Sequence, residues 1–518
     1  MRETYGRLLD QALLMRPAIV IAALLVGLMA VPFYLFSRQE LAPVEDQSHI
    51  SLFYESAPDA SLAETDRDSN KVSRALTAFP ESEYMWSQTQ SWGGYGGVVM
   101  KDWRNRNRST EQIYGQFYGA VSQVPGLRVF PRLDPPLPTS GNYDVEMVLQ
   151  SEAPPQQMLQ TTAAVLAAAW QSGKFLYVDT DLKIDLPEAR VVLDREQIAD
   201  LGLDLASVGQ ELGTLLGGNY VNRFNFFDRS YKVIPQIGEA DRATLAPLLD
   251  LKIKTPDGRM VPVSTFAHIE TNAAPRTLNR FQQRNSVRIY GGVNPGATKD
   301  EGLRVLENAA AAAGMPGMTI DYAGESRQIR LEGSALTITL GFSLVLIYLV
   351  LAAQFSSFRD PLIVLLGSVP LAISGALLFS FLDLTTINIY SQVGLITLVG
   401  LIAKNGILIV QFANVRQAAG LSKLDALRDA AMTRLRPVLM TSAAMVLGQL
   451  PLVVVSGPGA AARNSIGIIL VAGMIVGTTF TLFVVPVFYS LLAADHHRAA
   501  ENTEAGEEAS PRLSQQPT

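Results

Sequence analysis

Six apolar stretches limit what this chain can fold into more than any other feature of its sequence. They lie near residues 18–36, 336–354, 361–382, 390–412, 438–455 and 466–491. Each is long enough to cross about 30 Å of hydrocarbon as an α-helix. Hydrophobic residues make up 48% of the 518-residue chain and charged residues 17%, a mixture too apolar for most soluble enzymes and too charged for a bare helix bundle. We therefore expect several domains, one of which spans a membrane.

The first apolar stretch could be read as a signal peptide, because Arg2, Arg7 and Arg16 precede it. Its apolar part is long, however, and ends in AVPFYLFSRQE without a clear small-residue cleavage site. An uncleaved anchor is the favoured interpretation. Residues 1–36 would then form a cytoplasmic N-terminus and the first transmembrane helix.

The short loops give the orientation. Residues 413–437 hold five basic residues, whereas 383–389 hold none and 456–465 hold only Arg463. Basic loops stay on the cytoplasmic side. Residues 37–335 are therefore expected outside, and the polar tail 493–518 is expected to be a disordered cytoplasmic end.

The outer segment reads as two similar halves, each with the order β-α-β-β-α-β. The first covers residues 37–140, and the second covers 141–194 plus 271–330. An insertion at 195–270 separates the parts of the second half and contains two predicted hairpins, one around 224–236 and one at Asp257-Gly258. The predicted fold class is thus an α-helical membrane protein, with one helix before and five helices (331–492) after a large α+β domain of split βαβ, ferredoxin-like subdomains.

Composition argues against several functions. The net charge of −6 comes without a long basic run, so nothing points to nucleic acid. The chain has no cysteine, and its four histidines show no metal-ligand spacing that we recognise. No carboxylate dyad or catalytic triad emerges either. We therefore expect neither an enzyme nor a bound metal or cofactor.

Lys404 stands near the middle of an apolar run, in the sequence GLIAKNGILIVQ. A lysine at mid-bilayer costs about 2.5–3.5 kcal/mol on insertion scales, so it should face a protein interior and have a partner. Lysine can also reach the headgroups along its own stem, but Lys404 lies eight residues from residue 412, the nearer end of its span. Within the six spans as bounded above, it is the only Asp, Glu, Lys, Arg or His. Its counter-ion is therefore expected from another chain or from a missing half of this one.

The sequence RLRPVLMTS, residues 434–442, is the second notable motif. Pro437 suits the first turn of a helix, with Arg434 at its cytoplasmic mouth. Thr441 follows Arg434 by seven residues, which places both on one helix face. A proton or water path is one interpretation; a Thr441 hydroxyl that bonds back to its own helix is the other. Gly473 and Gly477 more simply indicate close helix packing.

These motifs, together with ELAPVEDQ after the first span and LGQLPLVVVSGPGAAARNSIG, resemble the C-terminal half of a resistance-nodulation-division (RND) multidrug efflux pump. The resemblance covers about residues 5–492 and is to the hydrophobe/amphiphile branch of the Gram-negative inner membrane. It implies transmembrane helices 7 to 12 of that family, two porter subdomains and half of a docking domain.

The resemblance also assigns roles. It implies that Lys404, Arg434 and Thr441 are members of a proton relay, whose two aspartates lie in a helix of the other half. Protonation of those aspartates would weaken their hold on Lys404. The family's switch loop corresponds to residues 87–103, where Trp92 and Tyr95 could stack on a substrate while glycines, Gly94 and Gly96 among them, keep the loop mobile. A glycine-rich turn beside an ordinary surface aromatic is the alternative.

The resulting functional hypothesis is a half-subunit of a proton:drug antiporter, driven by the proton gradient without a cofactor. Its expected partners are an N-terminal RND half with the aspartate pair, a periplasmic adaptor, an outer-membrane channel, membrane lipid and amphiphilic substrates, in a trimeric assembly. The alternatives are an inactive truncated remnant, a Sec-type accessory translocase, and a membrane-anchored periplasmic binding or assembly module.

Overall fold

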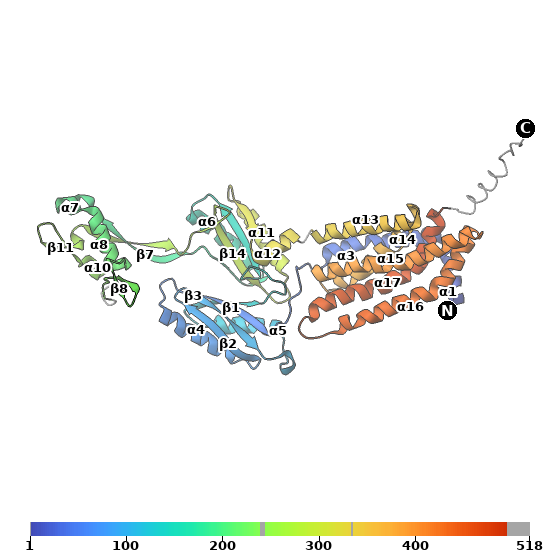
Figure 1. The fold of residues 1–518 in the computed structure, drawn as a ribbon, viewed down its shortest axis with the longest axis horizontal. Helices are drawn as coiled ribbons and strands as arrows, with labels where there is room; N and C mark the ends of the chain where they lie inside the picture. Colours follow the sequence, from blue (N-terminus) through green and yellow to red (C-terminus); the bar gives the residue numbers. More distant parts are fainter. Residues whose placement is uncertain (1, 239–243, 333–334, 495–518) are drawn as a thin grey trace, which may run out of the picture. The chain divides into compact units, whose positions relative to one another are not determined.

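The computed structural model describes residues 2–238, 244–332 and 335–494, so most of the tail expected at 493–518 lies outside the described residues. The described residues form two compact units. Unit 1 comprises those of Met1–Ser56, Ser61–Thr180 and Arg280–Thr518, and unit 2 comprises those of Ala57–Ala60 and Asp181–Asn279. Unit 1 contains all the long apolar helices and two β-sheets (Figure 1).

Six spans in the described residues are long and apolar enough to cross a membrane. The first, Arg16–Phe36, consists of α2 (Arg16–Leu28) and α3 (Ala30–Phe36), after α1 (Arg2–Leu14). The others belong to α13 (Ala335–Phe355), α14 (Arg359–Phe381), α15 (Ile389–Ala418), α16 (Lys423–Val454) and α17 (Ala460–Leu492). In the most apolar window of α14 and of α17, 61% of the residues are buried, against 11% in α13 and α16. The bundle therefore has its interior around α14, α15 and α17, and α16 lies at its edge.

Helices α15 and α16 are longer than the apolar stretches that predicted them. Residues 413–437 were expected to be a loop, but only 419–422 interrupt the two helices. Gly420 has a φ of +94° in this turn, and the Ser422 side chain caps α16 by accepting from the Asp425 amide. The sequence expectation was too short because it followed hydropathy, and the polar ends of these helices carry most of the basic residues.

The first sheet of unit 1 has the strand order β2-β3-β1-β4, with every neighbouring pair antiparallel. Along the chain its elements are β1 (His49–Ser56), α4 (Leu62–Thr77), β2 (Ser82–Gln90), β3 (Gly93–Met100), the short η1 (Trp103–Asn105), α5 (Thr110–Val121) and β4 (Leu127–Leu133). Helices α4 and α5 pack on one face, where alternate residues of β1 such as Ile50 and Leu52 are fully buried. The alternate residues of β1 between them, such as Phe53, lie on the opposite face of the sheet and are only partly buried.

The second sheet has the order β13-β14-β5-β15, with β6 paired to β14. Its elements are β5 (Val145–Ser151), α6 (Pro155–Gln171), β6 (Phe175–Thr180), β13 (Asn279–Phe281), β14 (Arg284–Val293), α11 (Lys299–Ala313), β15 (Thr319–Tyr322) and α12 (Gly324–Glu332). A strand expected here at 189–194 instead belongs to β7 (Ile184–Leu193), which pairs with β12 (Ala267–Pro275) in unit 2.

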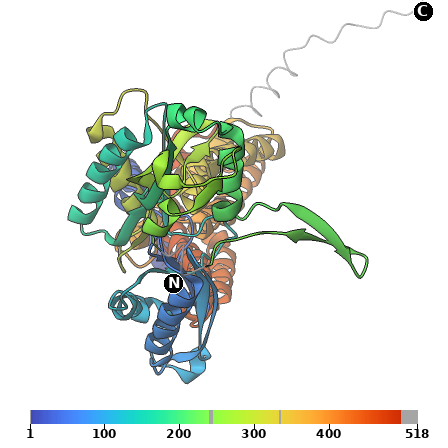
Figure 2. The same cartoon turned by 90° about the vertical axis from the view of Figure 1, so that its left-hand side faces the viewer.

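Unit 2 is smaller and has its own core, in which Ile198, Val208 and Phe266 are almost fully buried. Besides β7 and β12 it contains α7 (Arg195–Asp200), α8 (Leu205–Gly217), α10 (Ala246–Leu249) and η2 (Val263–Thr265). Both expected hairpins are confirmed, as β8 (Asn222–Phe226) with β9 (Arg229–Val233) and β10 (Lys252–Lys254) with β11 (Met260–Pro262). The β8–β9 hairpin, green in Figure 2, projects from the unit, and all residues of its two strands are exposed.

Candidate functional site

Lys404 lies on the outer face of α15. Its side chain is exposed, and so are those of Thr397, two turns before it, and Gln411, two turns after it. Gly400 lies on the same face. Among the described parts of the chain no ion pair includes the Lys404 ammonium. Within the described residues, no carboxylate neutralises this cation, although it falls inside an apolar span.

The next residue, Asn405, points the other way, because successive residues of a helix lie about 100° apart. It is 2% exposed, and its Nδ2 donates to Ser442 Oγ of α16 at 3.0 Å and to Thr478 Oγ1 of α17 at 3.2 Å. Thr478 Oγ1 in turn donates to Ser442 Oγ at 3.0 Å. This buried triad joins three helices. This triad was not predicted from the sequence, although the polar residue beside Lys404 in an apolar run was a signal.

Arg434 and Thr441 both lie partly buried on α16. The Arg434 guanidinium carbon lies 4.6 Å from the ring centre of Phe412 on α15, and its buried Nε has no hydrogen-bond partner among the described residues. The Thr441 hydroxyl donates to the Val438 carbonyl of its own helix at 3.1 Å. The structure thus brings Arg434 against α15, and no hydrogen bond in the described part of the chain joins Lys404, Arg434 and Thr441 to one another.

A second network, which includes a carboxylate, lies near the C-terminal end of α15. Asp360 is 3% exposed near the start of α14, and its Oδ2 accepts from Asn414 Nδ2 at 2.9 Å. The Tyr489 hydroxyl donates to Asn414 Oδ1 and accepts from Gln417 Nε2 at 2.6 Å. The sequence analysis left Asp360 out because its span began at residue 361. Asn414 is ten residues from Lys404 along α15, which is about 15 Å at 1.5 Å per residue, so Asp360 does not pair with Lys404.

Trp92 and Tyr95 lie at the β2–β3 hairpin of the first sheet. Trp92 is 57% exposed at the turn, where its Nε1 donates to Gln90 Oε1 at 2.8 Å. Tyr95 is 38% exposed, donates its hydroxyl to Gln88 Oε1, and makes an edge contact with Trp86 at 6.1 Å between ring centres. Tyr95 therefore lies on the sheet face that α4 and α5 leave open, and Trp92 is exposed at the turn.

This open face carries more aromatic residues than the sequence analysis named. Phe53 of β1 lies directly opposite Tyr95 of β3 and Phe130 of β4. The three rings therefore form a row across the sheet, and Trp86 extends it on β2. The alternation in HISLFYES predicts that Phe53 and Glu55 share a face, but only the register of the strands shows which residues lie beside them.

The glycines of β3 differ from the expectation of a mobile loop, because they pair within the sheet. A Cβ on Gly94 would lie 2.1 Å from the Gln88 carbonyl oxygen, and one on Gly96 would lie 2.5 Å from that of Trp86. Gly94 also has a φ of +153°. Close approach of the strands requires these glycines, and their role in the described structure is packing.

The aromatic row continues into contacts with the second sheet. Phe130 and Tyr290 of β14 meet edge to face at 5.8 Å, and Tyr290 stacks on Tyr143 at 4.0 Å between ring centres. The Tyr290 hydroxyl donates to Glu55 Oε1 at 3.0 Å. Burial raises the pKa of both tyrosines, so they remain neutral donors. The result is a seam of rings with a carboxylate at its edge.

Six apolar helices and a soluble part that combines helices with antiparallel sheets define the class as a multi-pass membrane protein with a large α+β domain. The chain belongs to the AcrB/AcrD/AcrF family of RND multidrug efflux transporters, whose sequence model matches residues 1–493. The resemblance inferred from the motifs is thereby confirmed.

Individual relatives agree with this assignment. The chain is 38% identical over 407 residues to an uncharacterised transporter of Haemophilus influenzae, covering 77% of this chain and 39% of that protein. It is 31% identical over 432 residues to the multidrug export protein AcrF of Escherichia coli K12, covering 82% and 42%. It is 32% identical over 406 residues to the multidrug resistance protein MdtF of the same strain, covering 76% and 39%. The chain spans about two-fifths of the length of these curated relatives.

Proposed function

We propose that this chain forms one half of a proton-driven multidrug exporter and works against a complementary half that carries the aspartate pair. The observation that carries the proposal is the position of Lys404, exposed on α15 within an apolar span and without an ion pair in the described residues. Such a cation needs a protein partner rather than lipid. The partner is either the rest of a longer polypeptide or a separate chain.

The surface around Lys404 suits a docked helix. Gly400 lies one turn before it, and Gly448 lies on the exposed part of α16. Among the described residues, no other group lies within 4 Å of a Cβ built on either glycine. Small residues allow helices to approach closely in membranes. We expect helices of the complementary half to cover this face and to bring carboxylates to Lys404.

Proton coupling then follows from electrostatics. Ionised aspartates would hold the Lys404 ammonium, and protonation would release it. Arg434 stands on the neighbouring helix near the cytoplasmic end, and Thr441 follows it at mid-helix. In this proposal both belong to the path by which protons leave, as the family resemblance implies.

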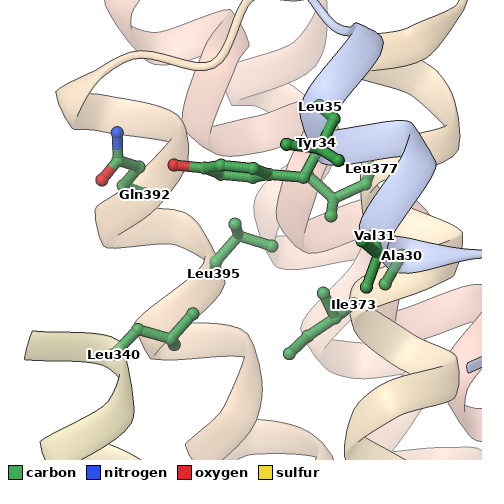
Figure 3. Close-up of a pocket in the computed structure, with 9 residues that line it drawn as sticks. All are labelled: Ala30, Val31, Tyr34, Leu35, Leu340, Ile373, Leu377, Gln392 and Leu395. Carbon is green, nitrogen blue, oxygen red and sulfur yellow. The ribbon is translucent and has the colours of Figure 1, made fainter. Parts of the chain in front are cut away.

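An apolar pocket offers a route for substrate from the membrane. It has a volume of about 270 Å³ and lies between α3, α13, α14 and α15, where Tyr34 extends toward Gln392 (Figure 3). The remaining lining side chains are aliphatic: Ala30, Val31, Leu35, Leu340, Ile373, Leu377 and Leu395. An acyl chain or the apolar part of an amphiphile fits this chemistry.

The aromatic face of the first sheet would receive substrate next. Trp86 and Tyr95 offer exposed rings for stacking, whereas Phe130 is buried against Tyr290. Glu55 and Asp134 add carboxylates. Burial alone would raise the pKa of Asp134, but hydrogen bonds from His49 and Ser51 hold it below its usual range, so it stays ionised at neutral pH. Aromatic rings beside an ionised carboxylate such as that of Asp134 favour cationic amphiphiles. The soluble part, with its split βαβ porter subdomains, would lie in the periplasm, and unit 2 would face an adaptor and an outer-membrane channel in a trimeric assembly.

The test is a dye-efflux assay in a pump-deficient Gram-negative strain, with this chain alone and then with a matching N-terminal half, adaptor and channel. We expect gradient-dependent export only with the complementary half. Export by the chain alone would contradict the need for a counter-ion from elsewhere. No export in either case, with insertion verified, would favour an inactive remnant or a binding module.

Two variants test the docking face. Lys404→Ala should insert normally and abolish proton-coupled efflux. Gly400→Leu should leave the isolated chain folded but prevent association with the other half. Gly341→Leu on α13 should leave both folding and association unchanged, although a Cβ on Gly341 likewise meets no described group within 4 Å. Full efflux by Lys404→Ala would refute the relay assignment, and equal behaviour of the two glycine variants would refute the docking face.

A further inference from the structure

The segment that follows the first span is bonded to the loop between α14 and α15. Gln39 and Ile387 form a parallel β-bridge. The Ile387 amide donates to the Arg38 carbonyl at 2.8 Å, the Glu40 amide donates to the Ile387 carbonyl at 3.1 Å, and the Ile389 amide donates to the Leu41 carbonyl at 3.0 Å. Four successive residues of the linker are thus fixed along this loop.

The Glu40 side chain extends the attachment to a third element. It is partly buried and accepts a hydrogen bond from the Thr386 hydroxyl. Thr386 Oγ1 accepts from Asn388 Nδ2 at 2.8 Å, and the same Nδ2 lies 3.2 Å from Ser465 Oγ of α17. A chain of polar groups therefore runs from the linker carboxylate through the loop to α17.

Charged groups on the helices of both sheets act on the same carboxylate. Lys299 of α11 is buried and donates to Glu325 Oε2 of α12 at 2.6 Å, with Asp144 Oδ1 at 3.8 Å. Lys299 favours the ionised form of Glu40, whereas Glu325 and Glu111 of α5 oppose it. On the loop itself, Asp383 is paired with Arg38 at 3.5 Å.

Burial has the largest effect on Glu40 and raises its pKa to about 7, although the Thr386 hydroxyl and Lys299 both lower it. A carboxyl group with this pKa is about half protonated at neutral pH. An ordinary glutamate would be ionised.

We propose that Glu40 is a proton-binding site outside the apolar spans, and that its protonation changes how the linker holds the α14–α15 loop. Ionised Glu40 accepts from Thr386 and is attracted by the Lys299 ammonium, which stays bonded to Glu325. Protonation removes that attraction and weakens the bond from Thr386. The site is distinct from Lys404, and only its use in transport rests on the proposed function.

The proton site is tested by infrared titration of the full chain in lipid nanodiscs. We expect a protonated-carboxyl C=O band that disappears with a midpoint near pH 7, is absent from Glu40→Gln, and is retained in Glu83→Gln, which changes an exposed carboxylate of β2. Absence of the band from the wild type, or its persistence in Glu40→Gln, would overturn the assignment.

Two further variants keep the test independent of any folding defect in Glu40→Gln. Thr386→Val removes a bond that lowers the pKa, so the midpoint should rise; Glu111→Gln removes a charge that raises it, so the midpoint should fall. Shifts in the opposite directions would contradict the geometry.

Amide exchange at Ile387 and Ile389, corrected for intrinsic rate, should change across the same pH range in the wild type and not in Glu40→Gln. An unchanged wild type would refute the coupling, whatever the transport assay gives.

Discussion

Replacing Gly375 with alanine should separate the two most deeply buried helices of the bundle. Gly375 lies on α14, and an added Cβ would stand 2.4 Å from Val476 Cβ and 2.5 Å from its Cγ1 on α17. Carbon atoms in contact prefer about 3.5–4.0 Å, so roughly 1 Å is missing. Val476 Cβ is attached to the backbone and cannot rotate away. The helices themselves must move.

The size of the effect follows from this shortfall. Overpacking a well-packed interior typically costs about 1–3 kcal/mol. If the helices move apart by about 0.5–1 Å, each atom pair across the contact loses between a quarter and a half of its dispersion energy. The separation would affect the whole α14–α17 contact, in which both helices are largely buried. We therefore expect Gly375→Ala to lower the free energy of unfolding by about 1–3 kcal/mol.

Reversible unfolding of the full chain in mixed micelles measures this difference. Gly341→Ala on α13 is the matched control, because a Cβ there meets nothing within 4 Å. A double-mutant cycle adds a sharper criterion: Val476→Gly should rescue Gly375→Ala, whereas Val476→Ala should not, since it keeps the clashing Cβ. Equal stability of the two alanine variants, or equal rescue by both Val476 changes, would refute the reasoning.

Two charge predictions concern the soluble part. Lys299→Met should lower the free energy of unfolding by about 3–5 kcal/mol at pH 7, because it leaves the buried carboxylates of Asp144 and Glu325 without their cation. Thermal unfolding should show a smaller loss at acidic pH, where the two carboxylates are protonated. A loss of stability that does not depend on pH would contradict this prediction. Burial alone would raise the pKa of Asp46, but hydrogen bonds from Arg106 and from backbone amides hold it below its usual range. This stabilisation is present above about pH 4 and is lost as the pH falls through the lowered pKa. The difference in unfolding free energy between wild type and Asp46→Asn should therefore be largest at neutral pH and vanish in strong acid. A difference that grew on acidification would contradict the prediction.

The membrane helices could be predicted from sequence because hydropathy is a property of the chain itself. Their ends could not, since helices continue beyond the apolar stretch, and this is why Asp360 was missed. The motif around Lys404 identified the family, but which way Lys404 and Asn405 face depends on the rotation of α15 in the bundle, and no periodicity of a nearly uniform apolar run fixes it.

In the soluble part, too, features that depend on neighbouring residues could be predicted, and features that depend on residues far apart in the sequence could not. Local signals such as Asp257-Gly258 located the hairpins correctly. The glycines of β3 were expected in a loop, and the structure places them in a paired strand. The sequence did not indicate this, because the need for them arises from strands that approach closely in space. The row from Trp86 to Phe130 likewise joins residues 44 positions apart, so only the strand register reveals it.

The hydrogen bonds between α15 and α17 have a mechanical consequence. They occur at three levels of α15: Asn388 lies 3.2 Å from Ser465, Asn405 lies 3.2 Å from Thr478, and Asn414 with Gln417 bonds to Tyr489. From Asn388 to Asn414 the helix rises about 39 Å at 1.5 Å per residue, so the two helices are joined over a full bilayer thickness. A displacement of α15 at Lys404 must therefore carry α17 with it as one rigid body, and the movement reaches both membrane surfaces together.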